Sequence, residues 1–218
     1  MKTVRILLAD DHEIFRCGLR AILSERPDWH ICGEAANGRE AVRLARKLKP
    51  NIILMDLAMP ELNGLEATRQ IRRAMPRTEV LVLTFDESEE PIREVLLAGA
   101  SGYLFKNDVS RVLVQAVEHL SHHRPFFTSR VSELLLKEYR GRDEGPAESP
   151  SSWVPLSPRE REVVQLVAEG KSSKAVAEAL GISVKTADNH RANIMRKLGL
   201  HSVSEWVRYA IRNKIIAP

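Results

Sequence analysis

The sequence of 218 residues predicts an α/β domain followed by a smaller all-α domain. Through roughly the first 120 residues, short apolar runs alternate with segments of helical spacing, which is typical of a doubly wound sheet of five parallel strands with helices on both faces. A stretch rich in Gly, Pro and Ser follows, and beyond it every pattern is helical. We therefore expect a first domain over residues 1–122, a linker helix and flexible linker over 123–152, and a four-helix domain over 153–218.

Apolar runs with the length of buried strands recur through the first domain. They are Val4–Ala9, Ile31–Ala35, Ile52–Met55, Val80–Thr84 and Gly102–Phe105. Helical segments such as GREAVRLARKLKP separate them. Right-handed crossovers would bring the carboxyl ends of these strands to one edge of the sheet, where ligands bind in doubly wound domains.

The stretch GRDEGPAESPSSW, residues 141–153, has the composition of a flexible linker. A short helix over TSRVSELLLKEY is expected to precede it. Four short helices are expected to follow, each beginning at a serine N-cap and three of them ending at a glycine. The caps are Ser157, Ser172 or Ser173, Ser183 and Ser202, and the glycines are Gly170, Gly181 and Gly199.

Basic charge is concentrated in the C-terminal third of the chain. Lys and Arg equal Asp and Glu, 18 against 18, through residue 125, whereas residues 153–218 carry 11 basic and 6 acidic side chains. This excess favours a polyanion such as nucleic acid as a partner, and a solvated basic surface is the alternative.

Hydropathy and cysteine content favour a cytoplasmic protein without membrane association. No apolar stretch approaches the roughly 20 residues that cross a bilayer. The start, MKTVRILLADD, makes a poor signal peptide because two acids follow a short apolar run. Cys17 and Cys32 form no CxxC pair, so free thiols are the simpler interpretation and a single disulfide is the alternative.

Three carboxylates follow two of the predicted strands. Asp10 and Asp11 come after the first run, and Asp56 comes after the third, in NIILMDLAMPELNG. Neighbouring strands would bring them together, and two carboxylates about 4 Å apart repel by roughly 4 kcal/mol at an effective dielectric of about 20. A Mg²⁺ ion would offset this repulsion, because Mg²⁺ prefers oxygen ligands and often shares phosphate oxygens. Surface loops or helix N-caps are the alternative for any single aspartate.

Two further strand ends add a hydroxyl and a cation. The fourth run ends at Thr84, and Lys106 follows the fifth. A lysine among carboxylates forms either a simple ion pair or, together with the Thr84 hydroxyl, a site for phosphoryl oxygens. Asp56 stands alone at its strand end and is the best nucleophile for phosphoryl transfer, whereas Asp10 and Asp11 are better placed as metal ligands.

These segments resemble the receiver domain of bacterial two-component response regulators over about residues 1–122. The resemblance is carried by LLADDHEIFRCGLRAIL, MDLAMPELNGLEATRQIR, VLVLTF and GASGYLFKND. It implies a flavodoxin-like fold in which Asp56 accepts phosphate from a sensor histidine kinase. It further implies a magnesium site made by Asp10, Asp11, Asp56 and the backbone carbonyl of Ala58, phosphoryl sensing by Thr84 and Lys106, and an aromatic switch at Tyr103. From the residues alone, Tyr103 is an ordinary strand aromatic.

A haloacid-dehalogenase-like phosphatase is the competing enzyme class, because it also forms an aspartyl phosphate. Such enzymes usually carry a second Asp two residues after the Asp that ends the first strand, and here that position is His12. No cap domain is evident either. We therefore expect no enzyme beyond self-catalysed phosphotransfer and autodephosphorylation.

The helix after GIS has the two faces of a recognition helix. Val184, Ala187, Ile194 and Leu198 recur at helical spacing and are expected to face inward. The outward face is expected to comprise Lys185, Thr186, Asp188, Asn189, His190, Ala192, Asn193, Arg196 and Lys197. We assign Lys185, Asp188, Asn189 and Ala192 to the edge that faces the DNA groove, and Arg191, Arg196 and Lys197 to phosphates. A solvated helix face is the alternative for each single charge.

The segment LSPREREVVQLVAEGKSSKAVAEALGISVKTADNHRANIMRKLGLHS resembles the LuxR-type helix-turn-helix of NarL/FixJ-type response regulators, over nearly all of residues 153–218. The resemblance implies that the last helix pairs two copies on DNA. We therefore expect a response regulator in which phosphorylation of Asp56 switches promoter binding. The expected partners are a sensor histidine kinase, double-stranded promoter DNA, a second copy of the chain and, as a further candidate, RNA polymerase. The alternatives are a DNA-binding regulator independent of phosphorylation and a phosphate-sink protein whose second domain binds proteins.

Overall fold

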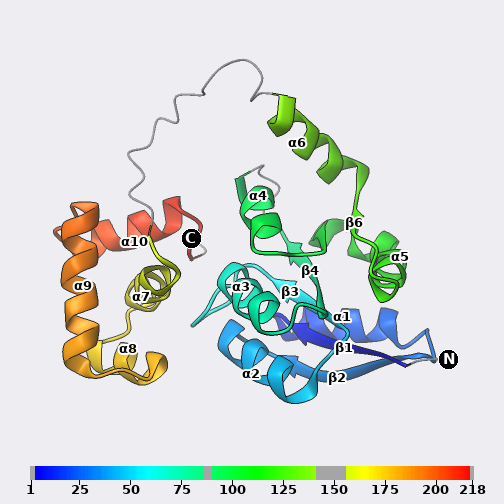
Figure 1. Ribbon diagram of the computed structural model, residues 1–218, viewed down its shortest axis with the longest axis horizontal. Coiled ribbons are helices and arrows are strands. Elements are labelled where there is room, and N and C mark those ends of the chain that lie inside the picture. Colours follow the sequence, from blue (N-terminus) through cyan, green and yellow to red (C-terminus); the bar gives the residue numbers. More distant parts are fainter. Residues whose placement is uncertain (1–2, 86–89, 141–155, 217–218) are drawn as a thin grey trace. The chain divides into compact units, whose positions relative to one another are not determined.

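In the computed structural model, residues 3–85, 90–140 and 156–216 are described. They form two compact units, each with a hydrophobic core of its own. The N-terminal unit contains a parallel sheet with its helices, and the C-terminal unit contains helices only (Figure 1). The predicted flexible linker falls on residues 141–155, which lie outside the described residues.

All neighbouring strands of the sheet run parallel. The strands are β1 Val4–Ala9, β2 Trp29–Ala35, β3 Ile52–Asp56, β4 Glu79–Thr84, β5 Gly102–Phe105 and β6 Phe126–Phe127. Their order is β2-β1-β3-β4-β5-β6, so the sheet is doubly wound as predicted. The register pairs Ala9 with Met55, and this pairing brings the residues that follow β1 beside the end of β3.

The sheet has six strands, so the expectation of five is wrong by one. The additional strand, β6, has only two residues and pairs with Gly102 and Tyr103 along the outer edge of β5. Two residues are too few to show the alternation by which a strand is recognised in a sequence.

Helices cover both faces of the sheet (Figure 1). They are α1 Glu13–Leu23, α2 Gly38–Leu48, α3 Gly64–Ala74, α4 Glu90–Leu97 and α5 Val109–Ser121, with a 3-10 turn, η1, over Lys106–Asp108. On one face, α1 and α5 share a core with alternate residues of the central strands, such as Leu8 and Leu54. The strand residues between them point the other way, where α2 and α3 contact the sheet and α4 packs beside α3.

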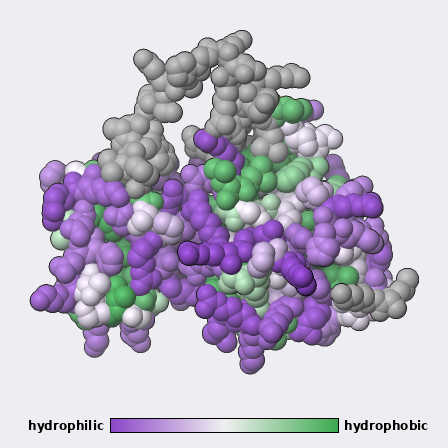
Figure 2. Space-filling view, viewed as in Figure 1, coloured by the Kyte–Doolittle hydropathy of each residue, from purple (hydrophilic) through white to green (hydrophobic). Residues whose placement is uncertain are grey.

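The helix predicted over TSRVSELLLKEY is confirmed as α6, Ser129–Arg140. Val131 anchors α6 because its side chain is fully buried, and the guanidinium carbon of Arg130 lies 4.8 Å from the ring centre of Phe105 on β5. Figure 2 shows hydrophobic residues gathering over α4 on one face of this unit. Cys17 and Cys32 are both free thiols, as the simpler interpretation predicted.

The C-terminal unit consists of α7 Pro158–Ala168, α8 Ser173–Leu180, α9 Val184–Leu198 and α10 Val203–Arg212. All four predicted serine caps are confirmed, and Ser172 rather than Ser173 caps α8, since its hydroxyl accepts a hydrogen bond from the Ala175 amide. The helices pack around Trp206, whose indole N–H donates to the carbonyl of Val164 at 3.0 Å. None of the described helices has both the length and the apolar composition that crossing a membrane requires.

Candidate functional site

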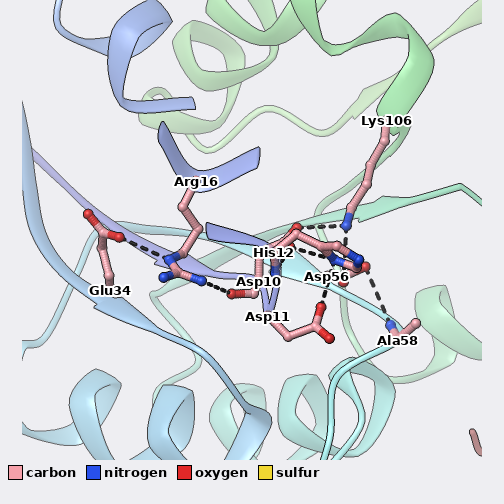
Figure 3. A network of polar contacts seen from close by, with 8 residues as sticks. All are labelled: Asp10, Asp11, His12, Arg16, Glu34, Asp56, Ala58 and Lys106. Carbon is pink, nitrogen blue, oxygen red and sulfur yellow. Dashed lines mark hydrogen bonds and ion pairs between the residues drawn. The ribbon is translucent and has the colours of Figure 1, made fainter. Parts of the chain in front are cut away.

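The carboxylates that the sequence singled out meet at one edge of the sheet (Figure 3). Asp56 is the last residue of β3, and Asp10 follows β1 directly. Both are buried, whereas Asp11 is exposed. Side-chain ligand atoms of Asp10, Asp11, His12 and Asp56 all lie within 4.8 Å of one another. The parallel register of β1 and β3 is the cause, because it aligns the ends of the two strands.

Lys106 supplies a cation to this cluster. Its Nζ lies 2.7 Å from Oδ2 of Asp10 and 3.0 Å from Oδ2 of Asp56. Apart from this ammonium, neither oxygen has a hydrogen-bond partner among the described residues. A buried carboxylate retains unused acceptor capacity in such an arrangement, and a hard cation can use it.

The two charged neighbours act on Asp56 in opposite directions. Burial is the largest influence and raises the pKa of Asp56 above its usual range. The Lys106 ammonium lowers this pKa, the Asp10 carboxylate raises it again, and the net result is a raised pKa. The other carboxylate oxygen, Oδ1, faces the backbone amide of Ala58 at 3.4 Å. The donor set of Asp10, Asp11 and Asp56 is one that suits Mg²⁺.

Thr84 and Tyr103 lie on the strands that continue the sheet from β3. Thr84 ends β4 and is buried, and its neighbour Leu83 pairs with Asp56. Thr84 itself pairs with Phe105, the residue before Lys106, so the predicted hydroxyl and cation sit at adjacent strand ends. Tyr103 is fully buried, and its ring meets that of Phe105 edge to face at 5.7 Å.

Gly64, at the start of α3, lies against the backbone of Asp56. A Cβ atom at this position would lie 1.9 Å from the carbonyl oxygen of Asp56, far closer than van der Waals contact. Its amide donates to the carbonyl of Leu57 at 2.9 Å. The glycine therefore allows the chain to turn back closely against the backbone of Asp56.

Arg16 is a site residue that the sequence did not indicate. Its guanidinium donates to the backbone carbonyl of Asp10 at 2.7 Å and to Oε2 of Glu34 on β2 at 3.0 Å (Figure 3). Burial acts to raise the pKa of Glu34, but hydrogen bonds from Arg20 and Arg16 lower it overall. This bridge fixes the loop after β1. Arg16 and Glu34 are 18 residues apart, on α1 and β2, so their pairing follows from the fold rather than from a local pattern.

His12 is a second residue near the carboxylates that had no predicted role there. Its Nδ1 lies 2.8 Å from Oδ1 of Asp11, and its backbone amide donates to Oδ1 of Asp10 at 2.9 Å. This hydrogen bond from the His12 amide orients the Asp10 carboxylate, because it engages Oδ1 and leaves Oδ2 facing Lys106.

The second candidate surface is the outer side of α9. Most of the residues expected to face outward are exposed: Lys185, Thr186, Asp188, Asn189, Ala192, Asn193 and Arg196. His190, Arg191 and Lys197 are partly buried. Arg191 donates to the Ser173 hydroxyl at 3.1 Å, and Lys197 pairs with Glu160 of α7 at 2.8 Å. The structure therefore turns Lys197 toward its own unit rather than fully outward.

The inward face of α9 is confirmed in part. Ala187 and Ile194 are fully buried, and Leu198 packs against the core. Val184 was predicted to face inward, and this is wrong, because its side chain is 46% exposed. It is the first residue of the helix, and helical spacing alone does not show where the core ends along the axis.

This fold and this cluster of carboxylates define the receiver class of signalling proteins. A model of the family "Response regulator receiver domain" matches residues 6–118, and a model of "Bacterial regulatory proteins, luxR family" matches residues 154–210. The chain thus belongs to the two-component response regulators of the NarL/FixJ type, which join a receiver domain to a LuxR-type DNA-binding domain. The family is one of regulatory proteins with a DNA-binding output domain.

Individual relatives match along nearly the whole chain. The chain is 39% identical to the transcriptional regulatory protein LiaR of Bacillus subtilis, over 98% of this chain and 99% of that protein. It is 36% identical to the oxygen regulatory protein NreC of Staphylococcus aureus, with the same coverage of both chains, 98% and 99%.

Solved structures of response regulators also match this chain. A LuxR-family response regulator from Aurantimonas sp. matches with a TM-score of 0.61 at 36% identity, covering 64% of this chain and 99% of that one. The RcsB response regulator of Salmonella typhimurium matches with a TM-score of 0.59 at 27% identity, covering 96% and 98%. RcsB has also been solved as dimers bound to DNA.

Proposed function

We propose that Asp56 accepts a phosphoryl group from a sensor histidine kinase and that this modification switches promoter binding by the C-terminal unit. The observation that supports it most is the buried contact of Lys106 with both Asp10 and Asp56 at the strand ends. An aspartate that shares a lysine ammonium with a second carboxylate suits phosphoryl transfer, in which catalysis consists of positioning and charge stabilisation. We assign the phosphoacceptor role to residues 1–122 and DNA binding to residues 153–218.

In the transfer, a carboxylate oxygen of Asp56 attacks phosphorus, and the bond from phosphorus to the kinase imidazole breaks. The imidazole leaves with the electron pair of that bond. Asp10, Asp11, Asp56 and the backbone carbonyl of Ala58 would hold a Mg²⁺ ion, which when bound neutralises charge on the phosphoryl oxygens. Lys106 would ion-pair with one phosphoryl oxygen, and the Thr84 hydroxyl would donate to another.

The response to phosphorylation would pass through Thr84 and Tyr103. Movement of Thr84 toward the phosphoryl group would change the end of β4, which pairs with β5. Tyr103 lies on β5 and is already packed inward against Phe105. The phosphoryl group would thus act as a ligand that favours one of two conformations of the receiver.

DNA binding would use the exposed side of α9. Lys185, Asp188, Asn189 and Ala192 would face the edges of bases in the major groove, with Thr186 and His190 beside them. Arg191, Arg196 and Lys197 would contact phosphates. Two copies would pair through α10, where Val203 leaves an apolar side chain 61% exposed. The RcsB dimers on DNA support a DNA-bound dimer by analogy. RNA polymerase is a further candidate partner. Promoter binding implies a cytoplasmic location.

Phosphoryl uptake is the direct test of the acceptor. Wild type, Asp56→Asn and a control variant, Asp28→Asn, would be incubated with acetyl phosphate and Mg²⁺, and intact mass would be measured. Asp28 is a suitable control because it lies before β2, near Arg26 and outside the site. We expect one phosphoryl group on wild type and on the control, and none on Asp56→Asn. Uptake by Asp56→Asn at the wild-type level would refute the assignment.

A further inference from the structure

Two aromatic rings flank the ammonium of Lys106. The Nζ lies 4.6 Å from the ring centre of Phe15, on α1, and 5.0 Å from that of Phe85, which follows β4. The two rings also meet each other edge to face, with centres 6.3 Å apart at an angle of 61°. Two carboxylate oxygens and two rings therefore surround one nitrogen atom.

Burial of hydrophobic surface accounts for only part of this arrangement. Phe85 is 58% exposed, so its ring is not a core residue, whereas the Lys106 side chain beneath is only 1% exposed. Phe15 is partly buried and also packs against the core of the N-terminal unit. The rings thus take the place of water around a buried cation, while much of the Phe85 ring itself remains exposed to solvent.

We propose that Phe15 and Phe85 are positioning residues, which hold the Lys106 ammonium against Asp10 and Asp56 so that it is in place when the phosphoryl group arrives. This inference rests on the proposed phosphoacceptor function. The faces of aromatic rings attract a cation, and the attraction grows when water is excluded. A lysine side chain has four rotatable bonds, and water around its ammonium would favour orientations that leave the site. Two rings beside the nitrogen make those orientations less favourable.

Both rings lie close in sequence to residues that are proposed to take part in the reaction. Phe85 directly follows Thr84, the residue proposed to move toward the phosphoryl group. Phe15 lies on the helix that begins immediately after Asp10, Asp11 and His12. The ammonium must exchange an oxygen of Asp56 for a phosphoryl oxygen during transfer, and the rings would hold it within the site during this exchange.

The first test observes the lysine directly, in the unphosphorylated full-length chain. Lysine ammonium signals would be recorded by ¹H–¹⁵N NMR, with Lys106→Arg to assign the signal of Lys106. Ring currents from Phe15 and Phe85 should move this signal away from the other lysines. Phe15→Leu and Phe85→Leu should each move it back, whereas Phe85→Tyr should retain the shift. The control is Phe126→Leu, which removes a ring from the core beside His119 and should leave the signal unchanged.

The second test measures phosphorylation by acetyl phosphate with Mg²⁺ in the same variants. The energy of one cation–π interaction corresponds to a factor of about 2 to 30 in rate. The maximal rate of phosphorylation should therefore fall by about this factor in each leucine variant. The KM for acetyl phosphate should change little, because lysine placement matters most in the transition state. Phe85→Tyr should restore most of the rate.

The outcomes separate this inference from the proposed function. If wild type is phosphorylated and both leucine variants match it in rate, the positioning role is overturned and the proposed function stands. If wild type takes up no phosphoryl group, the proposed function and the role in transfer both fail. In that case, a Lys106 signal that is the same in wild type and both leucine variants would also overturn the aromatic contact.

Discussion

At the scale of single residues, the site contains charged side chains that are costly to bury. Its backbone is also packed so closely that no side chain fits at Gly64. The Lys106 ammonium offsets the charges of Asp10 and Asp56 at contact distance. Gly64 allows the following segment to approach the carbonyl of Asp56. Each feature has a consequence for stability that can be measured without any ligand.

Gly64→Ala should destabilise the N-terminal unit. The added Cβ would overlap the carbonyl oxygen of Asp56 at 1.9 Å, so the backbone must shift at a cost of about 1–3 kcal/mol. The matched control is Gly18→Ala on α1, where an added Cβ meets nothing within 4 Å. Since alanine favours helix, this control should gain about 0.5–1 kcal/mol. Chemical unfolding of both variants measures the difference, and equal stability of the two would contradict this view of Gly64.

Asp56→Asn should stabilise the metal-free protein at neutral pH. Burial raises the pKa of Asp56 in the folded chain, so the folded state bears a cost whenever this group is ionised. Below the pKa of the unfolded chain both states are protonated, and that cost is absent. The gain in unfolding free energy of Asp56→Asn over wild type should therefore shrink as pH falls through the pKa of Asp56. Unfolding midpoints at neutral and mildly acidic pH test this, and a gain from Asp56→Asn that is the same at both would contradict it.

At the scale of elements, the serine caps and glycine ends of the C-terminal helices were readable from the sequence because capping is a local interaction. The two-residue β6 was not, since it is too short to show a period. Four contacts were also missed: Arg16 with Glu34, Lys197 with Glu160, and Lys106 with each of its two rings. All of them join residues from different elements, and only the folded chain brings these together.

Ser172→Ala should weaken α8 more than Ser173→Ala does. Ser172 accepts a hydrogen bond from the Ala175 amide, and loss of such a cap costs about 1 kcal/mol. Ser173 lies inside the helix, and its hydroxyl accepts from Arg191. Amide hydrogen exchange of α8 in the full chain should therefore become about fivefold faster in Ser172→Ala. Greater loss of protection in Ser173→Ala would show that the cap is assigned to the wrong serine.

The cations of α9 should contribute unequally to DNA binding. Arg196 is exposed, whereas Lys197 pairs with Glu160. Removing a phosphate contact lowers the slope of log affinity against log salt by about 0.9. Arg196→Gln should show this reduction on a mixed-sequence DNA duplex, and Lys197→Gln should show a smaller one. A larger effect for Lys197→Gln would mean that the ion pair opens on DNA.

At the scale of the whole molecule, the chain joins a phosphoacceptor candidate to a DNA-binding candidate, and both families are matched along it. The sequence was sufficient for this organisation because each unit carries its own motifs and its own core. It does not show how much the state of Asp56 changes the affinity for DNA, because that quantity is a coupling free energy between two sites.

The measurement that tests the central claim most directly is DNA affinity before and after phosphorylation. Wild type and Asp56→Asn would be titrated onto a duplex selected from a random library, with Mg²⁺ and with or without acetyl phosphate, while intact mass reports phosphoryl uptake. Allosteric coupling of ordinary size predicts that the phosphorylated wild type binds about 5- to 150-fold more tightly and that Asp56→Asn does not respond. Full phosphorylation of wild type without any change in DNA affinity would contradict the proposed switch.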